Sequence, residues 1–256
     1  MMILGSIVAS ARERTERDKR AGMPPQSGKK RSPFIFEKSL RRPDIAFICE
    51  IKKASPSKGI IAEDYPYLDI AREYEAAGAA AISVLTEPEF FQGADSHLSE
   101  ISKIVDIPLL RKDFIIDKFQ IEQSSRLGAD AILLICAILS PADLAEYIEE
   151  ADKFGLSCLV EVRDESEMKI ALGAGARMIG VNNRDLRNFS VDISNSIRLR
   201  NLAPKNVIFV SESGIRTAKE VENLRKHSVD AVLIGETLMR SEDKKAALAV
   251  LRGDKA

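Results

Sequence analysis

The sequence predicts an α/β fold, specifically a (β/α)8 TIM barrel with an N-terminal helical extension. From Ile45 onward, short apolar runs alternate with longer amphipathic segments and give eight strand candidates. Eight strand–helix units in about 210 residues suit this barrel, which typically needs roughly 250 residues with additions. A doubly wound open sheet is the alternative, but no Gly-x-Gly-x-x-Gly fingerprint follows any strand candidate.

Residues 1–43 differ in texture from the repeating part of the chain. The stretch from Ile3 to about Arg20 predicts one helix, and a basic, proline-broken connector follows it from Ala21 to Asp44. We therefore expect residues 1–43 to form a helical extension with a basic connector, and residues 44–256 to form the barrel domain.

Each strand candidate has the length of a buried strand and is bounded by turn residues. The candidates are IAFICEIKK from Ile45, AAISVLT from Ala80, PLLRKDF from Pro108, ADAILLICAIL from Ala129, SCLVEV from Ser157, RMIGVNN from Arg177, NVIFVSES from Asn206 and DAVLIGE from Asp230.

The segments between the strands carry helix start and stop signals. Ser140 is the expected N-cap of one helix, with Pro141 at its first position and Gly155 past its end. Asp117 caps another helix in the same way. A similar short sequence recurs four times where a helix ends and the next strand begins. These helix-to-strand joints start at Gly78, Gly128, Gly175 and Ser228.

Composition excludes several classes of protein. The 38 Lys and Arg against 39 Asp and Glu leave no basic field for nucleic-acid binding. The longest apolar run, Ala131–Ser140, is too short for a bilayer, which needs about 20 residues. No cationic segment precedes the apolar opening, unlike a secretory signal. Cys49, Cys136 and Cys158 are odd in number and predict reduced, buried thiols, so we expect a cytoplasmic protein.

Polar side chains collect at the C-terminal ends of five strand candidates, where strands buried on both faces should be apolar. They are Glu50, Lys52, Lys112, Glu161, Asn182, Glu212 and Ser213. One such residue could simply be an exposed strand end, but five strands together indicate an active site at the C-terminal rim. Charges of both signs in one desolvated mouth perturb each other's pKa, as proton-transfer chemistry requires.

Two glycine-containing segments indicate a phosphate site. SESGI follows the seventh strand candidate and LIGETLM the eighth, where this fold commonly binds phosphate through backbone N–H groups. Glycine at either turn alone is weak evidence, but both together point to phosphate. SPSKG at residues 55–59 adds hydroxyl groups on the same rim.

Other chemistries find no support in the motifs. His97 and His227 lie in polar helical stretches and predict solvated surface side chains without a metal. No CxxC, HExxH or GxSxG motif appears, which argues against zinc hydrolysis and a serine nucleophile.

Six motifs closely resemble the indole-3-glycerol phosphate synthase family, over essentially the whole chain and including the extension. They are EIKKASPSKG (50–59), LLRKDFI (109–115), LVEV (159–162), GVNNRDL (180–186), SESGI (211–215) and LIGETLM (233–239). The first motif and N-x-R-D-L are specific, whereas SESGI and I-G-x-x-L-M are shared more loosely with related phosphate-binding barrels.

The resemblance implies a lyase of tryptophan biosynthesis. It would close the indole ring of 1-(2-carboxyphenylamino)-1-deoxyribulose 5-phosphate, with loss of CO₂ and water, and would need no cofactor or metal. The protein would bind this small-molecule substrate and neither nucleic acid nor a membrane. We expect it to be a monomer or a weak homodimer.

Family roles carry over to the matching residues. Lys112 resembles the general acid on the ribulose carbonyl oxygen, Lys52 the partner of the anthranilate carboxylate and a second acid, and Glu161 the proton-removing carboxylate. Glu50 and Asn182 match residues that hold the lysine and the sugar hydroxyls. Arg184 and Glu212 complete the polar set, and the apolar wall for the ring would be Phe91, Phe114, Leu133 and Leu186. The phosphate would rest on Ser55, Ser213, Gly214, Gly235 and the backbone of Glu236.

Two details of this assignment carry physical expectations. Some family members have serine where this chain has Glu236, so we expect the carboxylate to turn away from the phosphate. Lys112 should point inward beside Leu110 and Phe114, where desolvation lowers its pKa and the carboxylates of Glu50 and Glu161 limit the shift.

Two alternatives remain. A Schiff-base aldolase would use Lys112 or Lys52 as a nucleophile in a phosphate-binding barrel. A non-catalytic phosphosugar-binding barrel is the other, but it has no need of an acid and a base side by side.

Overall fold

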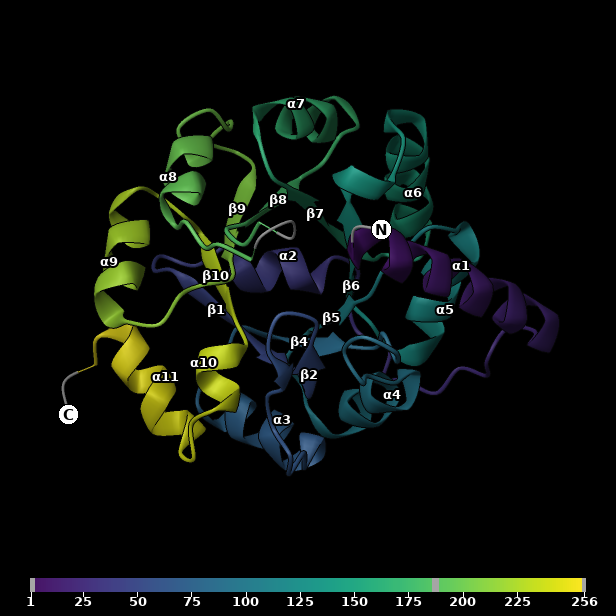
Figure 1. Ribbon diagram of the computed structural model, residues 1–256, viewed down its shortest axis with the longest axis horizontal. Helices are drawn as coiled ribbons and strands as arrows, with labels where there is room; N and C mark the ends of the chain where they lie inside the picture. Colours follow the sequence, from purple (N-terminus) through teal and green to yellow (C-terminus); the bar gives the residue numbers. More distant parts are fainter. Residues whose placement is uncertain (1–2, 186–188, 255–256) are drawn as a thin grey trace.

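The barrel is closed and all-parallel in the computed structural model, which describes residues 3–185 and 189–254 (Figure 1). Its eight strands are β1 (Ala46–Ile51), β4 (Ala81–Leu85), β5 (Leu109–Lys112), β6 (Ala131–Ile135), β7 (Ser157–Val162), β8 (Met178–Asn182), β9 (Ile208–Glu212) and β10 (Ala231–Ile234). Neighbours in the chain pair with one another, and Ala46 opposite Ala231 closes the ring. The predicted fold class and strand candidates are confirmed.

Helices surround this ring of strands. They are α3 (Tyr67–Ala76), α4 (Asp95–Ile104), α5 (Lys118–Leu127), α6 (Pro141–Lys153), α7 (Glu165–Gly173), α8 (Ser194–Arg200), α9 (Ala218–Lys226), α10 (Glu236–Met239) and α11 (Lys244–Arg252). A short 3₁₀ turn, η1 (Cys136–Ile138), follows β6, and a small hairpin of β2 (Ala54–Ser55) and β3 (Gly59–Ile60) follows β1.

The expected helix caps form. The Ser140 side chain accepts a hydrogen bond from the backbone N–H of Asp143, and Asp117 accepts one from Phe119. All three glycine joints have positive φ, and the fourth, Ser228, adopts φ +57° although it carries a side chain. Local signals therefore set these boundaries, since each cap satisfies backbone groups that the helix leaves unpaired.

The barrel interior is one apolar column built from alternate strand residues. Ile48, Leu110, Leu133, Leu159 and Val210 all belong to it and are at most 3% exposed. The opposite strand faces pack against the surrounding helices in a second, larger cluster. Period-two alternation thus separates the interior from the helix-facing layer, as expected of a parallel barrel.

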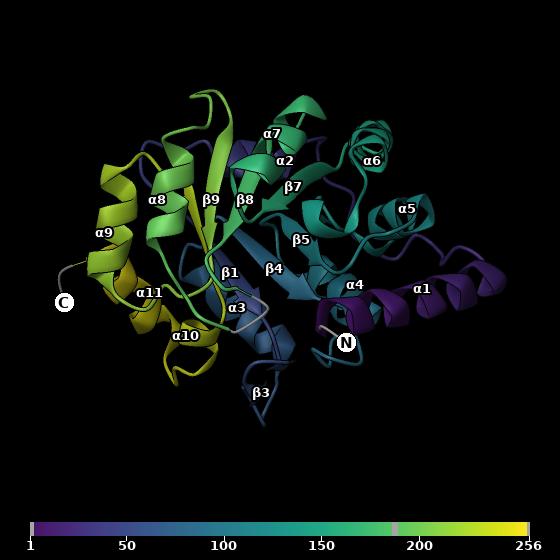
Figure 2. The same cartoon turned by 45° about the horizontal axis from the view of Figure 1, so that its top comes forward.

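The extension forms two helices at opposite ends of this column: α1 (Ile3–Ala21) and α2 (Ile35–Leu40) (Figure 2). Helix α1 confirms the predicted first helix. Helix α2 was expected to be irregular connector; Phe36 and Leu40, four residues apart, pack into the barrel interior and are at most 1% exposed. Six residues are too few for a periodic signal, so only this packing identifies the helix.

Three expectations about single side chains need correction. Cys49 and Cys158 are buried, free thiols as expected, but free Cys136 is only partly buried because it lies in η1, beyond the end of β6. His97 was expected in solvent and is half-buried; its ring lies 4.3 Å from that of Tyr67, centroid to centroid. His227 is likewise partly buried, with Nδ1 2.8 Å from the Asn223 carbonyl. Helical periodicity does not show which neighbouring elements cover such positions.

None of the helices in the described part of the chain is long and apolar enough to cross a membrane.

Candidate active site

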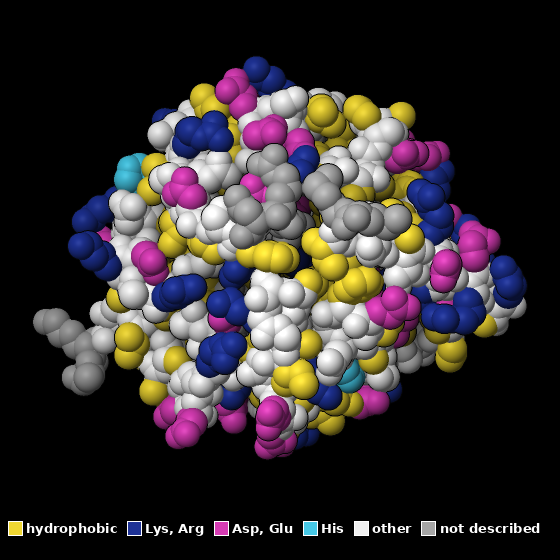
Figure 3. All heavy atoms as spheres, in the orientation of Figure 1, with side chains coloured by type: hydrophobic (Ala, Val, Ile, Leu, Met, Phe, Trp, Pro, Cys, Tyr) yellow, Lys and Arg dark blue, Asp and Glu magenta, His cyan; other side chains and the backbone are white. Residues whose placement is uncertain are grey.

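A cavity of about 160 Å³ opens at the C-terminal ends of the barrel strands. Hydrophobic and basic side chains lie next to one another near the centre of the face shown in Figure 3. The cavity is lined by every predicted site residue within the described ranges, namely Glu50, Lys52, Ser55, Phe91, Lys112, Phe114, Leu133, Glu161, Asn182, Arg184, Glu212, Ser213, Gly214, Gly235 and Glu236. Leu186 lies outside the described residues.

The two predicted catalytic lysines each pair with a carboxylate. Lys112, at the end of β5, forms a hydrogen bond and ion pair with Glu212 and lies 3.8 Å from Glu161. Lys52, just after β1, lies 2.5 Å from Glu50 Oε1. The lysine side chains are 14% and 17% exposed, so these charges interact largely out of bulk water.

The pKa of Lys112 is raised, not lowered as expected. Burial alone would lower the pKa, but the nearby carboxylates of Glu212, Glu161 and Glu50 outweigh that effect. The expectation was wrong because it left out Glu212, whose carboxylate directly contacts the ammonium group. Lys112 therefore remains an ammonium group throughout the physiological pH range.

Glu161 has the opposite character. Burial raises its pKa to about 7, against the lowering effect of Lys112, and the negative charge of Glu212 adds to the rise. A hydrogen bond with Asn182 favours the ionised form. Glu161 can thus gain or lose a proton near neutral pH, which suits a general acid or base.

Glu212 has one oxygen without a protein partner. Its Oε2 contacts Lys112, while the buried Oε1 has no hydrogen-bond partner among the described residues. A Cβ atom on Gly180 would lie 2.1 Å from that Oε1. The sequence pattern did not single out Gly180, yet only glycine there leaves room for Glu212. The free acceptor oxygen is suited to a substrate hydroxyl.

An apolar wall faces the charged cluster. The rings of Phe91 and Phe114 lie 6.1 Å apart, centroid to centroid, and Leu133 lines the same cavity. Helix α1 adds Ile3 and Ile7, which sequence reasoning missed. Ile3 and Ile7 reach the cavity only because α1 docks on the barrel, and no sequence motif in α1 predicts this docking.

The loop after β9 has an unusual backbone. Ser213 and Gly214 follow one another with φ values of +69° and +83°. The buried Asn183 side chain donates to the Ser213 carbonyl at 3.2 Å and to the Ser211 hydroxyl at 3.0 Å. Ser196 in turn donates to the Asn183 side-chain oxygen at 2.7 Å. This network, which the sequence pattern missed, offsets the cost of a left-handed serine in the loop after β9.

Glu236 has cationic partners, while its expected orientation away from a bound phosphate stays a prediction. It begins α10 and forms 3.5 Å ion pairs with Lys58, Arg184 and Arg240. The carboxylate therefore partly neutralises these three cations. Lys58 comes from the β2–β3 hairpin and was not among the predicted site residues.

Among the described residues, no cluster of three or more His, Cys, Asp or Glu side chains has the arrangement of a metal site.

Sequence comparison relates the chain to known proteins. The sequence model described as "Indole-3-glycerol phosphate synthase" matches residues 5–251. A relative of that name from Ruminiclostridium cellulolyticum is 57% identical, over 98% of this chain and 99% of its own length. Another from Endomicrobium trichonymphae is 54% identical, over 94% of this chain and 95% of its own length.

Solved structures support the fold independently. A crystal structure of 3-hexulose-6-phosphate synthase superposes with a TM-score of 0.68, at 14% identity, over 83% of this chain and 100% of that chain. At this identity the likeness concerns the fold alone. The match over residues 5–251 and the closely similar relatives confirm what the motifs predicted: the chain belongs to the indole-3-glycerol phosphate synthase family.

Proposed function

We propose that this protein is a decarboxylating lyase that forms indole-3-glycerol phosphate from 1-(2-carboxyphenylamino)-1-deoxyribulose 5-phosphate in tryptophan biosynthesis. The observation that carries the proposal is the single cavity in which Lys112, Glu161 and Glu212 lie between an apolar wall and the glycines after β9 and β10. These three regions match the three parts of the substrate: reacting ketone, aromatic ring and phosphate.

The substrate would lie across the cavity. Its aromatic ring packs on the apolar wall, to which we also assign Leu186, and its ring carboxylate pairs with Lys52. The phosphate accepts hydrogen bonds from backbone N–H groups at Gly214, Gly235 and Glu236 and from the hydroxyls of Ser55 and Ser213. The sugar hydroxyls and the lysine side chains are held by a set of three polar residues, Glu50, Asn182 and Arg184.

Ring closure begins when the carboxylate-bearing ring carbon attacks the ketone. A carbon–carbon bond forms, the C=O electron pair moves to oxygen, and Lys112 donates a proton to the resulting alkoxide. CO₂ then leaves, and the electrons of the broken bond restore the aromatic ring. The raised pKa of Lys112 supports this role, because the ammonium form that stabilises the alkoxide is always present.

Dehydration completes the indole. The hydroxyl departs as water after protonation by a lysine, and Glu161 removes a proton from the carbon beside the nitrogen. The electrons of that C–H bond form the new double bond. A pKa near 7 supports Glu161 as this base.

One assay tests the function. The purified protein is incubated with the carboxyphenylamino-deoxyribulose phosphate, and indole fluorescence is followed with little background because the chain has no Trp. Failure to form indole would refute the proposal. Borohydride trapping with a ketose phosphate tests the Schiff-base aldolase, which the ammonium state of Lys112 disfavours since its amine would have to be free. Binding of the substrate without turnover would instead identify a non-catalytic barrel.

We also propose that the protein works in the cytoplasm as a monomer or weak homodimer, without cofactor or nucleic acid. Three free cysteines support a reducing compartment, and a net charge of −1 disfavours nucleic acid. Sedimentation velocity over a range of concentrations would refute the monomer or weak homodimer if a stable higher oligomer appeared.

A further inference from the structure

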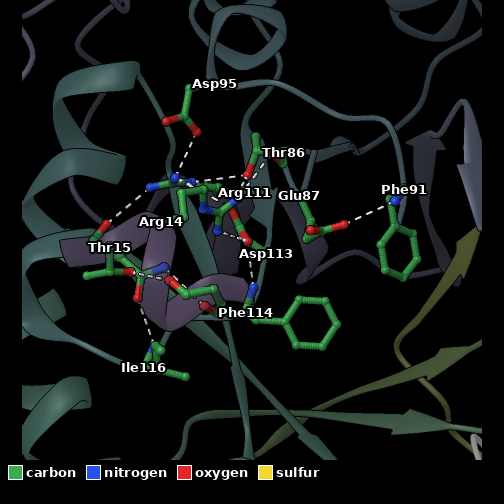
Figure 4. A network of polar contacts seen from close by, with 12 residues as sticks. Arg14, Thr15, Thr86, Glu87, Phe91, Asp95, Arg111, Asp113, Phe114 and Ile116 are labelled. Carbon is green, nitrogen blue, oxygen red and sulfur yellow. Dashed lines mark hydrogen bonds and ion pairs between the residues drawn. The ribbon is translucent and has the colours of Figure 1, made fainter. Parts of the chain in front are cut away.

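Arg14 in helix α1 lies in an unexpected environment. It belongs to the run ARERTERDKR, which has the composition of a solvated helix face, yet its side chain is only 10% exposed. It shares the buried face of α1 with Ile7 and Ala11. One arginine nitrogen, Nη2, lies 2.6 Å from Oδ1 of Asp113, almost a hundred residues away in the chain (Figure 4).

Asp113 is the centre of this contact. Its side chain is fully buried and lies between two proposed site residues in the sequence, Lys112 and Phe114. The carboxylate accepts hydrogen bonds from the Thr86 hydroxyl at 2.5 Å and from the Phe114 backbone N–H at 2.8 Å. Asp113 therefore holds the chain where the catalytic lysine and the apolar wall meet.

Arg111 balances the other side of Asp113. It lies 3.4 Å from that carboxylate and also pairs with Asp95 at 2.7 Å. Gln123 and Ser124 accept two more hydrogen bonds from it. Because Arg111 comes from β5 itself, the barrel has its own cation for Asp113. The additional cation from α1 therefore has a use beyond charge balance, namely joining the extension to the rim.

A second buried carboxylate holds the other aromatic ring of the wall. Glu87 accepts hydrogen bonds from the backbone N–H groups of Phe90 and Phe91, at 2.7 Å and 3.0 Å. Each ring of the Phe91–Phe114 pair is thus fixed through its backbone by a buried acid (Figure 4). Only Asp113 of these two is also held by the extension.

Helix α1 carries the remainder of the wall. Ile3, Leu4 and Ile7 line the cavity, and Arg14 lies seven residues, or two turns, beyond Ile7 on the same face. An anchor at Arg14 consequently sets the position of the apolar residues at the beginning of the helix.

We propose that Arg14 is a positioning residue: its ion pair with Asp113 docks α1 so that Ile3, Leu4 and Ile7 complete the pocket for the aromatic end of the substrate. The same contact keeps Phe114 and Lys112 in their places. This inference rests on the proposed function, since it assigns the apolar wall to the anthranilate ring.

Arg14→Gln tests the proposal, with Lys19→Gln as the matched control. Lys19 lies on the same helix and pairs with Asp117 at 2.6 Å, but both side chains are about one-third exposed. We expect Arg14→Gln to raise KM about tenfold or more and to lower kcat, because Asp113 loses its bond to α1 and a buried charge loses a partner. Lys19→Gln should change neither, as expected of a surface ion pair.

The phosphate end distinguishes positioning from general damage. The inhibition constant of inorganic phosphate should be unchanged in Arg14→Gln, and Arg14→Lys should recover part of the lost activity. If KM and kcat of Arg14→Gln stay within about twofold of the unaltered protein, the proposal is overturned, because an effect that small is typical of an exposed ion pair. An equal loss of phosphate affinity would overturn it as well.

Helix docking can be followed without turnover. Hydrogen exchange of α1 amides should speed up in Arg14→Gln and not in Lys19→Gln, while barrel amides stay protected. Unaltered α1 protection would overturn the proposal. If the unaltered protein fails to form indole, the proposed function fails, whereas this exchange experiment still decides whether Arg14 docks the helix.

Discussion

At the scale of single residues, Lys112 combines deep burial with three acidic neighbours. Lys112→Ala should lower kcat by about two to four orders of magnitude, the range of a lost general acid. KM should change far less, because the proposed contacts to the aromatic ring and the phosphate lie elsewhere in the cavity. Lys112→Arg should not restore activity, since guanidinium does not release its proton readily. Single-turnover kinetics would check this, and retention of more than about a tenth of kcat would transfer the role to Lys52.

Glu161 should set the pH dependence of turnover. Its pKa of about 7 means that the ionised base becomes available as the pH rises through neutrality. We expect kcat to rise across this range, with an apparent pKa that reflects Glu161 together with the charges around it. Glu161→Gln should lower kcat and remove this limb of the profile. A variant that keeps the limb would assign the titration to another group.

Glu236 should weaken phosphate binding. Its carboxylate pairs with Lys58 and Arg184 and would place a negative charge near a phosphate bound at the proposed site. Glu236→Gln should tighten the binding of inorganic phosphate about two- to fivefold, the range of one partly exposed charge pair. Glu242→Gln is the control, because Glu242 is an exposed residue between α10 and α11. Weaker binding in Glu236→Gln, measured by competitive inhibition, would show that the carboxylate instead organises the two cations.

At the scale of elements, β8, β9 and α8 are joined by the Asn183 network beneath the proposed phosphate loop. Asn183→Ala should weaken phosphate binding about tenfold, because the Ser213 carbonyl and two hydroxyl groups lose a partner. Asn201→Ala, at the exposed end of α8, serves as a control. Equal phosphate inhibition constants in both variants would mean that the left-handed turn holds without Asn183.

The two helices of the extension should differ in their effect on the fold. Removal of residues 1–22 deletes α1 and should raise KM while the barrel still unfolds cooperatively. Removal of residues 1–43 also deletes α2, whose Phe36 and Leu40 fill the barrel interior; each such loss costs about 2–5 kcal/mol. Urea denaturation compares the two truncations. Equal stability would show that α2 is dispensable and that the barrel begins near residue 44.

At the scale of the whole molecule, two buried acids with raised pKa values shape the pH dependence of stability. Burial raises the pKa of Glu161 to about 7 and that of Asp130 to about 6, the latter against its ion pair with Arg31. Between pH 5 and 7 these two carboxyl groups bind more protons in the folded state than in the unfolded chain, so their contribution to the free energy of unfolding falls as the pH rises. The half-buried His97, whose pKa is lowered by burial, contributes in the opposite direction. We expect the free energy of unfolding of the Glu161→Gln variant to fall less over this pH interval. Urea denaturation at pH 5 and pH 7 measures the free energy of unfolding of both proteins. An equal fall between the two pH values in both proteins would contradict this prediction.

Much of the fold was predictable because its signals are local. Apolar runs of strand length, the Ser140 and Asp117 caps and the glycine joints each report on a few neighbouring residues. The site residues at the strand ends were predictable for a related reason. A parallel barrel brings the C-terminal ends of all its strands to one rim, so polar residues there must converge.

The sequence by itself determined the barrel, the residues of its rim and the family, because strand periodicity and motif spacing are written along the chain. Only the tertiary structure decided that Arg14 is buried, that α2 fills the bottom of the barrel, and that Glu212 contacts Lys112. Burial and electrostatic interactions depend on distances between segments far apart in the sequence. For the same reason the direction of the Lys112 pKa shift followed from neighbours on β1, β7 and β9, and not from the residues beside it on β5.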